Sequence, residues 1–111
     1  MQYRRLGQCG LQLSAFSFGA WVTFGRQVGR SQARELIALA HDRGVNFFDN
    51  AETYNAGAAE ELMGDVLADL RFPRDSYCVS SKVYFGAVRC CSRATRWASS
   101  IASAGHSLVP Q

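Results

Sequence analysis

Gly-Val-Asn-Phe-Phe-Asp-Asn-Ala-Glu-Thr-Tyr, residues 44–54, is the stretch that decides the fold. Its glycine follows a run with helical periodicity and is typical of the residue just beyond a helix end. Residues 45–49 are mostly apolar and predict a short strand that ends on the carboxylate of Asp49. Tyr54 then lies in the loop after this strand. The stretch therefore predicts a strand whose carboxyl end and following loop carry polar side chains.

Helices are predicted on both sides of this strand. The helix before it has Ser31 as its N-cap, and its apolar positions recur at helical spacing from Ala33 to His41. The helix after it covers Ala58–Leu70. Its apolar face comprises Leu62, Met63, Val66, Leu67 and Leu70. A further strand, Tyr77–Lys82, follows this helix and ends on a cation.

The N-terminal residues predict a β-hairpin and one more strand. Tyr3–Leu6 and Leu11–Leu13 flank a turn that contains two glycines, and Ala15–Phe18 is expected to be a short buried strand stopped by Gly19. The order is therefore a hairpin followed by β-α-β-α-β, which predicts an α/β fold with parallel strands and right-handed crossovers. The order alone does not distinguish an open doubly wound sheet from the start of a barrel.

Three polar side chains are expected at one rim of this sheet. Asp49 and Lys82 end neighbouring strands, Tyr54 follows Asp49 in the next loop, and the carboxyl ends of parallel strands line active sites. An ammonium lowers the pKa of a nearby tyrosine from its usual value of about 10, and a carboxylate keeps the lysine charged. Such a tyrosine can protonate a carbonyl oxygen while hydride reaches the carbon. The alternative is that Asp49 only organises its loop and that Lys82 is a surface residue.

Several motifs resemble the aldo-keto reductase superfamily. The matching segments are residues 3–7, 10–14 and 18–25 at the N-terminus, residues 44–54 with the catalytic aspartate and tyrosine, and Ser81-Lys82 with the catalytic lysine. Within this superfamily the sequence is most similar to the branch of voltage-gated potassium-channel β-subunits and their bacterial relatives. The resemblance covers residues 1–87.

The resemblance implies the N-terminal part of a (β/α)₈ TIM barrel, which is not closed in this chain because a whole barrel takes about 250 residues. It also implies NADPH-dependent reduction of aldehydes or ketones. In that reaction Tyr54 would be the general acid, Lys82 would modify its pKa, and Asp49 would orient Lys82. Trp21, Gln27 and Asp49 would contact the nicotinamide end of NADPH.

Residues 88–111 do not resemble the family, and we expect an unrelated tail. Arg89, Arg93 and Arg96 lie in this segment, which contains no acidic residue. Its composition is typical of translation in a shifted reading frame. The alternative is a replacement helix, because Ala94 and Ile101 belong to one apolar face. Since residues 1–87 match only part of a barrel, we expect a truncated and inactive chain.

Charge and hydropathy exclude other classes of function. Residues 1–87 contain nine basic and nine acidic residues, which does not favour nucleic acid as a partner. The uncharged stretch 6–25 is interrupted by glycine, glutamine and serine, so we expect no membrane insertion. The four cysteines lack metal-ligand spacing, so we expect no metal site and a cytoplasmic protein.

Two functions from different classes follow from these observations. The first is an oxidoreductase that reduces a small carbonyl substrate with NADPH. The second is a non-catalytic interaction protein similar to potassium-channel β-subunits. In the second case the partner would be a channel or a second copy of the chain.

Overall fold

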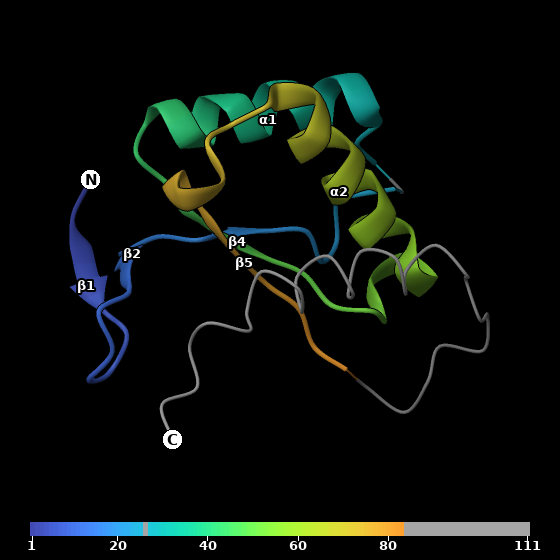
Figure 1. Ribbon diagram of the computed structural model, residues 1–111. Helices are drawn as coiled ribbons and strands as arrows, with labels where there is room; N and C mark the ends of the chain where they lie inside the picture. The colour runs from blue at the N-terminus through green and yellow to red at the C-terminus, as the bar shows by residue number, and fades with distance from the viewer. Residues whose placement is uncertain (26, 84–111) are drawn as a thin grey trace.

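The computed structural model describes residues 1–25 and 27–83 (Figure 1). Two antiparallel strands form a hairpin, and three parallel strands form a sheet in the order β3-β4-β5. The strands are β1 (Tyr3–Arg5), β2 (Gln12–Ser14), β3 (Phe18–Gly19), β4 (Phe47–Asp49) and β5 (Cys78–Ser80). The helices are α1 (Arg30–Asp42) and α2 (Ala58–Leu70), with short 3₁₀ turns at η1 (Tyr54–Gly57) and η2 (Arg74–Ser76). The predicted tail, residues 88–111, and its candidate helix lie outside the described residues.

Neighbouring strands of the sheet are also consecutive in the chain. β4 pairs in parallel with both β3 and β5, and Phe48 lies opposite Phe18 on one side and Val79 on the other. α1 connects β3 to β4, α2 connects β4 to β5, and both helices cover one face of the sheet (Figure 1). A doubly wound sheet reverses its strand order and carries helices on both faces, whereas a TIM barrel keeps the chain order with all helices outside. The described residues are therefore the beginning of a barrel that they do not close, as predicted.

The hydrophobic core lies between the two helices and the sheet. Its largest fully buried apolar side chains are Phe24, Phe48, Ile37, Met63 and Val66. The last three belong to the apolar faces predicted for the two helices. The ring of Phe18 lies 5.8 Å from that of Phe24 and 6.2 Å from that of Phe48, between centroids. This packing fixes β4, and with it the strand end that carries Asp49, relative to the helices.

The predicted start of α1 is wrong by two residues, because Ser31 was expected to be the N-cap. The N–H of Ala33 donates to the carbonyl of Gly29 at 2.9 Å, so Gly29 is the N-cap and Ser31 lies inside the first turn. Arg30 therefore begins the helix. From this position its guanidinium reaches the carboxylate of Asp69 on α2 at 2.7 Å, which ties the start of α1 to the second helix.

The strands are shorter than predicted. The expected strand Ala15–Phe18 is wrong, because the N–H of Ala15 donates to the carbonyl of Gln2 at 2.8 Å and so extends the hairpin. Phe16, expected to be buried, is 73% exposed, and the strand of the sheet begins only at Phe18. The other two predicted strands, 45–49 and 77–82, are reduced to the three residues of β4 and β5.

Gly44 lies just beyond α1, as predicted, and has a φ of 87°. An added Cβ would lie 2.9 Å from the Cβ of Met1 and 2.9 Å from the hydroxyl of Tyr3, which donates to the Gly44 carbonyl. We expect Gly44→Ala to lower the free energy of unfolding by about 1–2 kcal/mol, the cost of a left-handed non-glycine residue. Urea denaturation measures this loss. Gly10→Ala is the control, because a Cβ there meets open space, and equal losses in both variants would contradict the prediction.

Candidate active site

The carboxyl ends of β4 and β5 bring three polar side chains together. Asp49 is the last residue of β4, Lys82 lies two residues beyond β5, and Tyr54 begins η1. The Nζ of Lys82 lies 2.8 Å from both carboxylate oxygens of Asp49 and 3.3 Å from the Oη of Tyr54. It also lies 5.1 Å from the centroid of the Tyr54 ring. The structure therefore places the three predicted catalytic residues in one cluster, while their roles stay predictions.

Hydrogen bonds hold the loop after β4 against the chain after β5. The N–H of Asn50 donates to the carbonyl of Ser80 at 2.9 Å, and the N–H of Glu52 donates to the carbonyl of Lys82 at 3.3 Å. In the opposite direction, the ammonium of Lys82 donates to the carbonyl of Asn50 at 2.9 Å. These bonds fix the separation between the residue that carries the carboxylate and the residue that carries the ammonium.

Asp49 has a second partner, which the sequence analysis missed. The hydroxyl of Ser80 donates to the Oδ1 of Asp49 at 2.6 Å, and the two residues lie opposite each other in the parallel register. Ser80 and Lys82 are two residues apart, and in an extended chain such residues point to the same face. This spacing is the signal in the sequence that could have identified Ser80 as part of the site.

Opposing effects act on the pKa of each charged group of the cluster. Partial desolvation raises the pKa of Asp49, but the hydrogen bonds from Lys82 and Ser80 and the ammonium charge outweigh it, so the pKa lies below its ordinary value. Desolvation lowers the pKa of Lys82, but the contacts with Asp49 and Tyr54 outweigh it, so this pKa lies above its ordinary value. The Asp49 and Lys82 side chains are 30% and 53% exposed, so water weakens the interaction. At neutral pH the two groups therefore form a carboxylate–ammonium pair.

We expect the stability of this part of the chain to fall at both ends of the pH scale. The folded-state pKa of Asp49 is depressed, so its contribution is present above the unfolded pKa of about 3.9 and is lost as the pH falls through the folded value. The folded-state pKa of Lys82 is raised, so its contribution is present below about 10.4 and is lost as the pH rises through the folded value. Urea midpoints across the pH range measure both limbs. Asp49→Asn should flatten the acid limb, and an equal effect of Asp75→Asn, which removes an exposed carboxylate, would contradict this assignment.

Of the two other residues predicted at the cofactor, Trp21 lies beside the cluster, whereas the side chain of Gln27 makes no hydrogen bond to it. The indole stacks on the Tyr54 ring, with centroids 6.2 Å apart and planes inclined by 25°. Trp21 is nevertheless 71% exposed. Its loop is attached to the site because the N–H of Ala20 donates to the carbonyl of Asp49 at 3.1 Å. Gln27 is exposed, and its side chain makes no hydrogen bond with the described residues.

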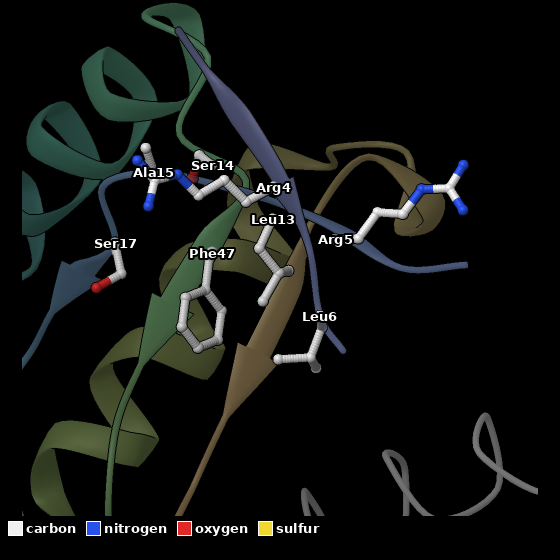
Figure 2. A pocket seen from close by; sticks show the side chains of 8 residues that line it. All are labelled: Arg4, Arg5, Leu6, Leu13, Ser14, Ala15, Ser17 and Phe47. Carbon is white, nitrogen blue, oxygen red and sulfur yellow. The ribbon is translucent and has the colours of Figure 1, made fainter. Parts of the chain in front are cut away.

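A separate hollow lies at the opposite end of β4 (Figure 2). It has a volume of about 290 Å³, and Phe47, the first residue of β4, lines it together with residues of the hairpin. Figure 2 shows the side chains of Leu6, Leu13 and Phe47 gathered in this region, whereas Arg5 points away from them. None of the predicted site residues lines this hollow. Because Phe47 is the first residue of β4, the hollow lies at the amino end of the sheet.

Two other kinds of site are absent from residues 1–25 and 27–83. Within these ranges, no three side chains of His, Cys, Asp or Glu are grouped so that they could hold a metal ion. Neither helix of this part of the chain combines the length and the hydropathy that crossing a membrane requires. The cluster at the ends of β4 and β5 is therefore the candidate site that the described residues offer.

Comparison with known families agrees with this geometry. A model of the aldo/keto reductase family matches residues 15–108. The chain belongs to the aldo/keto reductase family. The matched range includes Asp49, Tyr54 and Lys82, together with Trp21 and Gln27. It also extends past residue 87, where the resemblance described above ends, into residues outside the described part of the structure.

Two plant proteins are among the similar curated relatives. The chain is 48% identical over 86 residues to a probable voltage-gated potassium channel subunit beta of Arabidopsis thaliana. It is 50% identical over 86 residues to the protein of the same description in Oryza sativa subsp. japonica. Each alignment covers 78% of this chain and 26% of the relative. The chain therefore spans about a quarter of the length of these relatives.

Solved structures of the family resemble the chain in fold as well as in sequence. A putative aldo-keto reductase from Pseudomonas aeruginosa matches with a TM-score of 0.61 and 38% identity, over 73% of this chain and 31% of that chain. An aldo-keto reductase from Bacillus halodurans in its holo form matches with a TM-score of 0.64 and 27% identity, over 81% of this chain and 29% of that chain. These matches confirm the predicted fold class, an α/β sheet that forms part of a TIM barrel.

Proposed function

We propose that the chain carries the acid–base part of an active site that reduces aldehydes or ketones with NADPH. The observation that carries this proposal is the position of the Lys82 ammonium, which is bound to both oxygens of Asp49 and lies 3.3 Å from the Tyr54 hydroxyl. The match to the aldo/keto reductase family supports it. The substrate class, a small carbonyl compound, belongs to the proposal.

The cluster can deliver a proton at one defined atom. The ammonium of Lys82 donates to the Oη of Tyr54, which leaves the phenolic proton free to be donated to a carbonyl oxygen. As that proton leaves, negative charge develops on Oη beside the ammonium, which stabilises it electrostatically. Asp49 keeps the lysine charged and oriented. When bound, NADPH supplies the hydride that the carbonyl carbon receives.

The aromatic surface beside the cluster fits the nicotinamide end of this cofactor. Trp21 is largely exposed and stacks on the Tyr54 ring, so a flat side chain with room for a planar ring borders the proton donor. Reductases of this family generally use a nicotinamide dinucleotide. We assign Trp21 and Asp49 to the nicotinamide end, and Gln27, on the same exposed loop as Trp21, as a further polar contact.

A second function, that of a non-catalytic partner of a potassium channel, is favoured by one observation. Both plant relatives, at about half identity, are described as probable voltage-gated potassium channel subunits beta. In this case the partner would be the cytoplasmic part of a channel or a second copy of the chain, and the protein would be cytoplasmic. Binding to such a channel without turnover of aldehydes would favour this function over the first.

The proposed function is tested by the turnover of an aromatic aldehyde, which is measured as the loss of NADPH absorbance. The 111 residues are expected not to turn over on their own, because the described sheet has three strands with two open edges. We therefore expect turnover in a barrel chimera, in which residues 1–83 replace the matching segment of the Pseudomonas aeruginosa reductase. A folded chimera without turnover would contradict the proposed function, and turnover by the 111 residues would contradict the expected inactivity.

A further inference from the structure

One buried acid lies beside the cluster without contacting its reacting atoms. Glu60 belongs to the first turn of α2 and is 8% exposed. Burying a carboxylate costs free energy unless the group is hydrogen-bonded. Its Oε1 accepts a hydrogen bond from the hydroxyl of Ser81, the residue that directly precedes Lys82. The helix that follows the tyrosine loop is thereby attached to the chain segment that carries the lysine.

The same turn of α2 is attached to the end of β4. The fully buried side chain of Asn50 donates to the carbonyl of Ala59 at 3.0 Å and accepts from the N–H of Ala51 at 2.9 Å. The backbone carbonyl of Asn50 accepts from the Lys82 ammonium at 2.9 Å. The first turn of α2 therefore contacts both strand ends, through Asn50 after β4 and through Ser81 after β5.

We propose that Glu60 and Ser81 are positioning residues, which hold the chain after β5 so that the Lys82 ammonium lies between Asp49 and Tyr54. The inference rests on the proposed function, because it concerns the same site. A hydroxyl–carboxylate hydrogen bond is directional, so it restricts the backbone at Ser81 and with it the direction of the next side chain. An apolar contact of the same size would bury as much surface without this restriction.

The full chain offers a direct measurement, because Lys82 is its only lysine. Isotope-labelled lysine gives a single side-chain signal in nuclear magnetic resonance, and the exchange of its Nζ protons with water reports on the contacts of the ammonium. We expect Ser81→Ala to accelerate this exchange about five- to tenfold, the factor that one hydrogen bond represents. Ser81→Thr keeps the hydroxyl and should restore the wild-type rate. Glu60→Ala should behave like Ser81→Ala.

Glu61→Ala is the matched control, because Glu61 lies in the same turn of α2 but is exposed. Wild-type exchange in Ser81→Ala and Glu60→Ala, with the helix content preserved in circular dichroism, would overturn the proposal, as would an equal effect of Glu61→Ala.

If either alanine variant unfolds, Glu60→Gln decides, because a neutral amide is a weaker acceptor in nearly the same shape. Faster exchange in Glu60→Gln supports the proposal, and an unchanged rate overturns it. The measurement requires no NADPH and no turnover. A negative result would therefore overturn the positioning role of Glu60 and Ser81 separately from the proposed function.

Discussion

Tyr54→Phe is expected to lower kcat of the barrel chimera by about 10²–10⁴-fold, the usual contribution of a positioned general acid. The substitution removes only the hydroxyl, whose oxygen lies 3.3 Å from the Nζ of Lys82, and keeps the ring that stacks on Trp21. Because the ring persists, we expect the KM for NADPH to change little. Steady-state kinetics with an aromatic aldehyde separate the two constants.

Tyr77→Phe provides the matched control for this measurement. Its ring packs edge-on against Phe48 and Phe72 in the core, and its hydroxyl lies outside the cluster. Removing that hydroxyl should leave kcat unchanged. If Tyr54→Phe retained wild-type turnover, or if both variants lost the same factor, the phenol at position 54 would not be the proton donor.

The sequence predicted α2 and the shared rim of the sheet better than the limits of the short strands. The limits of α2 agree with the prediction at both ends, because apolar spacing that repeats over successive turns gives a periodic signal that a single residue does not obscure. Asp49 and Lys82 were expected at one rim and meet there, because parallel strands end at a common rim, although β5 ends two residues before Lys82. Three-residue strands are too short to give a comparable period. The strand expected at Ala15–Phe18 was therefore misplaced, and Ala15 pairs with the hairpin instead.

The supporting contacts of the site depend on tertiary structure and were not predicted. The bond between Ser81 and Glu60 joins residues 21 positions apart, and the bond between Ser80 and Asp49 joins residues 31 positions apart. Neither pair has a local motif, since a serine in a strand and a glutamate in a helix are ordinary residues. The packing of α2 against the sheet brings Glu60 to Ser81, and the pairing register of β4 and β5 places Ser80 opposite Asp49.

Lys82→Met is expected to lower kcat of the barrel chimera by about 10²–10⁴-fold as well, because the phenol loses the charge that stabilises its conjugate base. Methionine keeps most of the aliphatic length, so the loss reports on the ammonium more than on packing. Arg74→Met is the control, since this guanidinium lies 5.1 Å from the centroid of a different tyrosine ring, that of Tyr77. Its removal should leave turnover unchanged.

The variant that combines Asp49→Asn with Lys82→Met decides how Asp49 acts. Both carboxylate oxygens accept from the Lys82 ammonium at 2.8 Å, and the carboxylate reaches the phenol through this ammonium. We therefore expect Asp49→Asn to lower kcat strongly in the wild-type background and to add little after Lys82→Met, because residues that act as a unit are not additive. Losses that multiply in the double variant would show that Asp49 acts independently of Lys82, and the orienting role assigned to the carboxylate would then be wrong.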